Sequence, residues 1–411
     1  MFFTFVVLKF GASIKMKKLL VCSYICILFA SCSDKQQQTE KFMNRTCYTI
    51  DLDGSKEISI PYSSIFKNAR TIILEFEEDC MIGRIDELQV FDECFYILDR
   101  FYAKSLFVFD MEGKFLRKIG SLGQGPGEYI RISDFTIDTE NRFIFLLDNG
   151  RYVHKYRLDG TYISSITMQM PRTNSLFIQF YNNRLYSSVR AYTPAPDDYM
   201  LVEIDPNTGK LLSKSLPLKY NKGWAELVIM GHSFFMSRLG SPPRYAQLYM
   251  DTIMSIGEYI LPYIELKSKN LVTEKDIDLA NFQKQDMDGL SFLDRNSKIW
   301  DVHSFVENDN IIIFKYRSGS RGSHFSVVFH KETESVRIAK YLSNDMVLKP
   351  SHDWFVNFRF ADKQGVYEIS RPQDIQEFIR DGKVVSKLDK LDQLINLNEE
   401  SNPVIFYYEF K

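Results

Sequence analysis

The segment Lys104–Leu116 reads KSLFVFDMEGKFL, and His154–Ile163 repeats its pattern as HKYRLDGTYI. Each copy places an Asp/Gly turn between two runs rich in β-branched and aromatic residues, which predicts a β-hairpin. Related turns follow, so that glycines recur at positions 113, 160, 209 and 257, spaced by 47, 49 and 48 residues. A repeat of roughly 40 to 50 residues that holds about four strands indicates a β-propeller.

The repeat organises most of the chain into four-stranded units. Residues 270–285 interrupt the period, and their apolar residues at helical spacing predict a helical insertion. Five complete units are expected at residues 82–119, 132–166, 176–216, 225–266 and 298–341.

The sixth unit lacks one strand. Between residues 354 and 410 the pattern predicts three strands and one largely helical segment, 372–397. The isolated strand expected at 69–76 can complete this unit and leave the ring without free sheet edges. We therefore predict an all-β fold over residues 69–411, a six-bladed β-propeller whose last blade is closed by an N-terminal strand, plus a few helical insertions.

Composition and charge exclude one class of partner. Aromatic residues make up 14% of the chain, which suits half-buried strands. Lys and Arg number 51 and Asp and Glu number 53, for a formal net charge of -2. Because there is no general basic field, we expect no nucleic-acid partner.

The N-terminal segment resembles a bacterial lipoprotein signal. From Met16, the expected start, a basic pair and a short apolar run lead to LFASC, which ends at Cys32. The resemblance implies a signal peptide over residues 1–31, lipidation of Cys32 and a flexible tether over 32–68. It implies anchoring to the outer membrane through the lipid only, with the leaflet left open. An ordinary cleaved signal or a membrane anchor is the alternative.

Three segments carry a resemblance to a known family. They are GSLGQGPGEY at 120–129, the hairpin at 105–119 and the ending ESNPVIFYYEF at 400–410. Together they resemble the six-bladed β-propeller lipoproteins of Bacteroidetes, a family of uncharacterised function that is distantly similar to NHL-repeat and TolB-like propellers. The glycine-rich stretch lacks the Lys-Ser/Thr pair of a phosphate-binding loop, so we interpret it as a crossover between blades.

No local motif predicts catalysis or a cofactor. The six histidines have no ligand spacing, and there is no Gly-x-Ser-x-Gly sequence. We therefore predict no cofactor, although separate blades could gather ligands for a divalent metal around the axis. Asp99, Asp148 and Asp159 end strands or enter turns and are interpreted as backbone caps.

The candidate binding residues are arginines next to tyrosines in the loops between the second and third strands. Equivalent loops of a propeller lie on one face, where Arg can bind a carboxylate or sulfate and Tyr can stack on a ligand. The alternative is that these arginines pair with strand-end aspartates and pack on neighbouring loops. The candidates are Arg100, Tyr102, Arg151, Tyr152, Arg190, Tyr192, Arg238, Arg244, Tyr245, Tyr316, Arg317 and Arg321.

Taken together, these features predict a binding or scaffolding module of the cell envelope. Its expected partner is an anionic glycan, a peptide or another envelope protein. The alternative is a lyase or hydrolase that uses channel residues, with or without a divalent metal. Fold alone does not decide between these functions, and the sequence favours the non-enzymatic one.

Overall fold

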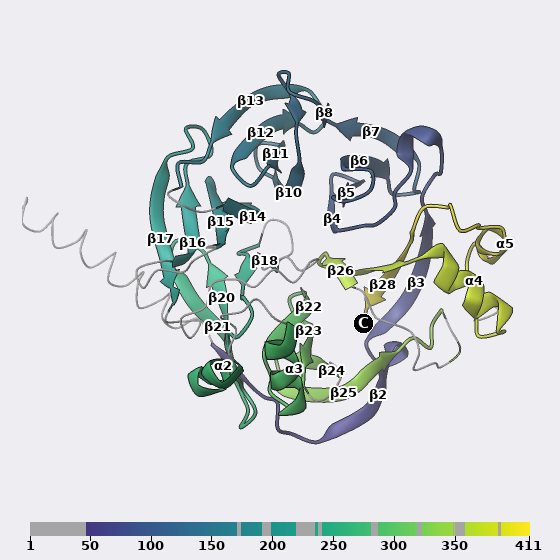
Figure 1. Ribbon diagram of the computed structural model, residues 1–411. Coiled ribbons are helices and arrows are strands. Elements are labelled where there is room, and N and C mark those ends of the chain that lie inside the picture. The colour runs from purple at the N-terminus through teal and green to yellow at the C-terminus, as the bar shows by residue number, and fades with distance from the viewer. Residues whose placement is uncertain are drawn as a thin grey trace, which may run out of the picture. The chain divides into compact units, whose positions relative to one another are not determined.

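The computed structural model describes residues 47–170, 174–190, 199–218, 235–236, 241–280, 287–318, 323–347, 349, 358–384 and 388–411. In these residues the strands form six sheets of four or five strands and one two-stranded ribbon. The sheets are arranged as blades around a central axis (Figure 1). The predicted all-β six-bladed propeller is therefore confirmed.

Blades 1 to 3 are meanders of four antiparallel strands in chain order, with the first strand nearest the axis and the fourth at the periphery (Figure 1). Blade 1 contains β4 (Glu87–Phe91), β5 (Cys94–Asp99), β6 (Ser105–Asp110) and β7 (Phe115–Ile119). Blade 2 contains β10 (Ile132–Asp138), β11 (Phe143–Asp148), β12 (Tyr152–Arg157) and β13 (Tyr162–Thr167). Blade 3 contains β14 (Asn174–Tyr181), β15 (Arg184–Arg190), β16 (Tyr199–Ile204) and β17 (Leu211–Pro217).

Blades 4 to 6 follow the same order, and each gains an outer strand from the N-terminal part of the chain. Blade 4 contains β18 (Phe235–Met236), β19 (Arg244–Tyr245), β20 (Thr252–Ile256) and β21 (Ile260–Lys267). Blade 5 contains β22 (Asp301–Glu307), β23 (Ile311–Arg317), β24 (His324–His330) and β25 (Ser335–Ser343). Blade 6 contains β26 (Phe358–Ala361), β27 (Gly365–Ser370) and β28 (Val404–Phe410).

The ring is closed by β3 (Phe66–Ile73), which lies antiparallel to β28 as the outer strand of blade 6. This is the closure that the isolated N-terminal strand predicts. Two earlier strands extend the scheme: β1 (Tyr48–Asp51) adds in parallel to β21 of blade 4, and β2 (Lys56–Pro61) adds in parallel to β25 of blade 5. The short 3-10 helix η1 (Tyr62–Ser64) links β2 to β3.

The prediction of a flexible tether up to residue 68 is therefore wrong for residues 48–68. These residues are ordered because their backbone groups pair with β21 and β25, whose sequences lie far along the chain. Neither β1 nor β2 has a nearby hairpin partner, so no local pattern indicates a strand.

Two of the periodic glycines have a second role besides the turn. Gly113 has φ +90°, and a Cβ atom there would lie 2.3 Å from the carbonyl oxygen of Ile73 on β3. Gly209 has φ +72°, and a Cβ atom there would lie 2.2 Å from the carbonyl oxygen of Thr167 on β13. Each turn thus packs on the outer strand of the preceding blade, and only glycine permits both the conformation and the contact.

The glycine-rich segment after blade 1 is a crossover, as the sequence indicates. Its strands β8 (Ser121–Leu122) and β9 (Glu128–Tyr129) pair in parallel, and the Gly125 N–H donates to the Glu128 carboxylate at 2.7 Å. The buried Tyr129 hydroxyl donates to the Lys104 carbonyl oxygen at 3.1 Å. A second crossover, from blade 6 to blade 1, contains the 3-10 helix η2 (Glu78–Cys80).

In the part of the chain that the structure describes, α-helices occur in two connections. α2 (Glu274–Ala280) and α3 (Met287–Arg295) connect blades 4 and 5, so the predicted insertion is present and continues beyond residue 285. α4 (Pro372–Arg380) and α5 (Leu391–Ile395) connect β27 to β28, in the segment expected to be largely helical. Among the described residues, no helix is both long enough and apolar enough to cross a membrane.

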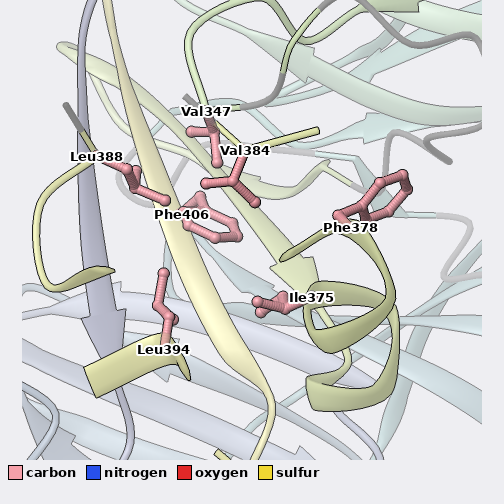
Figure 2. Close-up of a pocket in the computed structure, with 7 residues that line it drawn as sticks. All are labelled: Val347, Ile375, Phe378, Val384, Leu388, Leu394 and Phe406. Carbon is pink, nitrogen blue, oxygen red and sulfur yellow. The ribbon is translucent and has the colours of Figure 1, made fainter. Parts of the chain in front are cut away.

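Helices α4 and α5 are held on blade 6 by apolar packing. Ile375, Phe378 and Leu394 belong to the same core cluster as Phe406 of β28. A small cavity remains between them, and Figure 2 shows that all the residues around it are apolar. Because it presents no hydrogen-bonding side chain, this cavity is a packing feature rather than a candidate polar binding site.

The blades pack face to face through apolar clusters, and polar contacts join their inner strands. The Asp134 carboxylate on β10 accepts the Ile178 N–H on β14 at 2.8 Å. On the same strands, the Thr136 hydroxyl accepts the Phe180 N–H at 3.0 Å. The inner strands of blades 2 and 3 are therefore close together and fixed in register.

Candidate functional site

One end of every blade carries both kinds of connection that could hold a ligand. In each blade the first strand begins at the end where the second strand finishes. Glu87, at the start of β4, pairs with Leu98 near the end of β5, and Asp301, at the start of β22, pairs with Arg317 at the end of β23. The loop between the second and third strands and the crossover to the next blade therefore lie at the same end. We call this end the crossover face; it is the face on which the sequence predicts the arginine and tyrosine loops.

Four charged side chains gather near the axis at the crossover face, and we call them the axial cluster. Glu87 begins β4, Asp134 lies near the start of β10 and Arg359 lies in β26. Arg100 follows β5, and its guanidinium carbon is 5.4 Å from the centre of the Phe177 ring on β14. Blades 6, 1, 2 and 3 thus all contribute to this region.

The two carboxyl groups of the axial cluster retain protons more readily than usual. Burial raises the pKa of Glu87, the nearby Asp134 raises it further, and the charges of Arg100 and Arg359 oppose the shift. Burial also raises the pKa of Asp134, against the effect of Arg100 and of the Ile178 N–H. Because these acids hold protons at unusually high pH, they balance the two arginines incompletely near neutral pH.

The arginines of the axial cluster have unused donors. The Nε atoms of Arg100 and Arg359 are buried and have no hydrogen-bond acceptor among the described residues. Each residue as a whole is partly exposed. A buried donor without an acceptor costs about 1–3 kcal/mol, so an acceptor supplied from outside the protein would relieve that cost.

Strand-end aspartates shape the surrounding loops, as the sequence predicts. Asp99 accepts the backbone N–H groups of Gly83 and Tyr102, both at 2.8 Å. Asp148 accepts the Arg131 N–H at 2.7 Å. These carboxylates are occupied by the backbone and connect each loop to the adjacent crossover.

Of the predicted binding residues, Arg244 has a structural partner. Its Nε donates to Oε1 of the buried Glu307 at 2.7 Å, and its guanidinium lies 3.5 Å from the centre of the Tyr263 ring. Lys331 donates to the other oxygen of Glu307 at 2.8 Å. This is the alternative that the sequence left open, an arginine used for pairing, although its partner is a glutamate on the next blade. The predicted placement of Arg244 and Tyr245 in the loop after the second strand is wrong, because the two residues form the second strand itself, β19.

Two predicted tyrosines are part of the core. Tyr245 is fully buried, and its hydroxyl contacts the Gln247 amide nitrogen at 2.6 Å and donates to the Met200 carbonyl oxygen at 3.1 Å. Tyr316 is also fully buried and stacks on Phe325 with ring centres 5.4 Å apart. Neither ring can reach a ligand at the surface.

The other described candidates differ in exposure. Tyr102 is 70% exposed and packs over Gly83, while Arg151 and Tyr152 are exposed on blade 2. Arg317 is partly buried, with its guanidinium 4.8 Å from the centre of the Trp300 ring. Arg190 ends β15. Tyr192, Arg238, Arg321 and the lipidation candidate Cys32 lie outside the described residues.

The sequence analysis missed Glu87, Asp134 and Arg359 because it considered loops rather than inner strands. A usable pattern was present, since each is a charged residue in the first strand of a blade and is followed by an apolar residue. The described residues contain no group of three or more His, Cys, Asp or Glu side chains that could hold a metal ion.

The fold and these buried charges define a six-bladed β-propeller with a polar region at one end of its axis. Residues 47–409 match the family described as Domain of unknown function (DUF4934). The chain therefore belongs to the DUF4934 family. No protein of curated function matches the sequence.

Two solved Bacteroides proteins are similar in structure. One, from Bacteroides fragilis NCTC 9343, is described only as expected to be exported. It is 18% identical to this chain, with a TM-score of 0.71, and the match covers 89% of this chain and 100% of that chain. The other is a member of the DUF4221 family from Bacteroides vulgatus ATCC 8482, with 12% identity and a TM-score of 0.53, covering 84% of this chain and 97% of that one. At these identities the likeness concerns the fold alone.

Proposed function

We propose that this protein is a binding module of the cell envelope that holds an anionic group at the axial cluster. The observation that carries the proposal is the pair of buried Nε donors without acceptors, on Arg100 and Arg359. The ligand would be an acidic glycan or a peptide carboxylate. Arg presents a planar fork of donors that matches carboxylate and sulfate oxygens.

The charge balance supports an anion rather than a cation. Glu87 and Asp134 face the arginines, and both have raised pKa values because of burial. When these acids are protonated, Asp86 is the acid that remains near Arg359, and Asp86 is already paired with Arg84, so positive charge is left in excess. A bound carboxylate or sulfate would neutralise that excess in a region of low dielectric constant.

We also propose that the module is exported and anchored to the outer membrane through lipidated Cys32. Support comes from the sequence between Met16 and Cys32 and from the description of the related Bacteroides fragilis protein as expected to be exported. The tether is then residues 33–47, because the propeller begins at Tyr48. Metabolic labelling with a fatty acid, lost in Cys32→Ser, tests the anchor.

The binding proposal is tested on protein that begins at residue 33. Oligogalacturonate, a sulfated heparin oligosaccharide and a glutamate-rich peptide are titrated by calorimetry against the native protein. We expect Arg100→Ala and Arg359→Ala each to weaken binding of the preferred probe by about tenfold or more. Arg151→Ala, which removes an exposed arginine of the same face, is the matched control.

Two outcomes would reject the axial site. One is binding that Arg151→Ala weakens as much as Arg100→Ala does. The other is binding of any of the three probes that survives the Arg100/Arg359 double substitution in a protein whose melting temperature is unchanged.

A second candidate function is proton-transfer catalysis, as in a lyase or hydrolase. The specific observation is that Glu87 and Asp134 hold protons at unusually high pH beside the same arginines, which is a frequent property of catalytic acids. Glu87→Gln should then retain binding of the preferred probe and abolish its conversion. If mass spectrometry detects no product from the native protein, the catalytic function is rejected and only the binding function remains.

A further inference from the structure

Blade 5 contains a second set of charged and polar side chains, on the other side of β26 from the axial cluster. Three strands of this blade place them on one face. Asp301 of β22, Arg317 of β23 and His324 of β24 are opposite each other in the strand register. His303 and Lys315 form the neighbouring pair.

Short distances show that these side chains converge. The rings of His303 and His324 meet edge to face, with centres 4.8 Å apart. Nδ1 of His303 lies 3.3 Å from Oδ2 of Asp301. The guanidinium of Arg317 stacks on Trp300 at 4.8 Å, which fixes its plane.

Two adjacent members of this group have a polar atom without a partner. Nε of Arg317 and Nδ1 of His324 are buried and have no hydrogen-bond partner among the described residues. The two residues are directly opposite on adjacent strands, so their side chains lie on the same face and about 5 Å apart at Cβ. One oxygen-bearing ligand could therefore accept from both.

Cations and acids both surround these atoms. Arg317 and Lys315 are cationic, and burial lowers the pKa of Lys315 only to about 8, so it is mostly protonated near neutral pH. Asp301 lies beside His303, and Glu368 of blade 6 faces Lys315 and accepts the Tyr62 hydroxyl at 3.2 Å. Asp301 is also opposite Arg317 in the strand register, so the two cations face two acids, and the case for an anion rests on the unpartnered Nε of Arg317 and Nδ1 of His324.

We propose that blade 5 contains a binding site for a compact oxyanion, a phosphate or sulfate group, which accepts hydrogen bonds from Nε of Arg317 and Nδ1 of His324. Lys315 supplies additional positive charge. The site is distinct from the axial cluster, because Arg359 of β26 interacts with Glu87 and Arg100 on the side of blade 1. It therefore stands whether or not the proposed function holds.

Binding at this site is coupled to protonation of His324. In the unliganded protein, burial and the neighbouring His303, Arg317 and Lys315 lower the pKa of His324 to about 4, while Asp301 opposes the shift. A bound anion stabilises the imidazolium and raises that pKa. Affinity for sulfate, whose own charge is constant in this range, should therefore increase as the pH falls from about 7 to about 5.

The first test is an NMR titration of the histidine ring signals of the native protein with inorganic phosphate and with sulfate. We expect a saturable shift of the His303 and His324 signals, while His154 and His330 are unaffected. A parallel titration with glucose 6-phosphate distinguishes a free ion from a phosphate group on a larger ligand. Shifts with glucose 6-phosphate as well as with the free ions indicate that the site accepts a terminal group of a larger ligand. Shifts with the free ions alone indicate a site for a free ion. Absence of a saturable shift with all three overturns the proposal.

Variants give the second test. Arg317→Met keeps an apolar stem on Trp300 but removes the donors, and it should weaken phosphate binding by about tenfold or more. Lys340→Met removes an exposed cation of the same blade and should leave binding unchanged. Equal affinity in Arg317→Met and Lys340→Met would contradict the proposed contacts. If Arg317→Met does not fold, the titration of the native protein still decides.

Discussion

Arg244 and Arg100 come from equivalent sequence patterns, an arginine with a tyrosine close by, yet their surroundings differ. Nε of Arg244 donates to Glu307 at 2.7 Å and its side chain is only 11% exposed. Nε of Arg100 has no acceptor among the described residues, and the acids near it, Glu87 and Asp134, have raised pKa values. Arg244 begins the second strand of blade 4, at the end of the blade opposite the crossover face, whereas Arg100 follows the second strand of blade 1 at the crossover face. The comparison teaches that the end of the blade at which an arginine lies decides whether it meets a structural partner or remains available to a ligand.

The largest effect should come from breaking the paired site. Glu307→Gln removes the carboxylate shared by Arg244, Lys331 and Tyr263 and leaves two cations partly buried without it. We expect a loss of about 3 kcal/mol in the free energy of unfolding, measured by urea denaturation. Asp92→Asn, which breaks an exposed pair with Arg142, is the control and should change little. Similar losses in both variants would mean that Glu307 is not a buried charge partner.

A smaller effect should separate the two arginines directly. Arg244→Met should cost about 2 kcal/mol of stability, because Glu307 loses a partner. Arg100→Met should change stability by less than about 1 kcal/mol in either direction, because it also removes an unsatisfied buried donor. Matched denaturation curves test this difference. Equal destabilisation would show that Arg100 is structural too, and would weaken the proposed binding role.

The smallest effect is one of pH. The pKa of Glu87 is raised in the folded state, so between its unfolded and folded values the folded protein binds more protons, and stability falls as pH rises through that window. Glu87→Gln removes this penalty. Its stability relative to the native protein should be about equal near pH 4 and higher near pH 9. A difference that does not depend on pH would mean that Glu87 titrates normally.

The sequence predicts the ring because its turns repeat. The hairpin glycines, the helical interruption after blade 4 and the isolated N-terminal strand are local features, and each corresponds to an element of the structure. The additional strands β1 and β2 could not be predicted, since they consist of four and six residues and their partners are remote.

The candidate site was predicted less completely than the fold. The crossover face and Arg100 follow from the loop pattern, whereas Arg359 and Asp134 lie in strands whose orientation toward the axis the sequence does not reveal. Burial of Tyr245 and Tyr316 could not be foreseen either, because it depends on neighbouring strands and blades that fill the space around each ring. Arg244 was ambiguous because Glu307 is 63 positions away.

The three N-terminal strands also determine when folding can finish. Tyr48 pairs with Ile264, Lys56 with Ile338, and Phe66 with Phe410 near the end of the chain. The strands synthesised first therefore wait for the strands synthesised last, and contacts of such long range slow folding. Until the C-terminal strand is available, unpaired strand edges stay exposed to other chains, so this propeller should depend on chaperones during biogenesis.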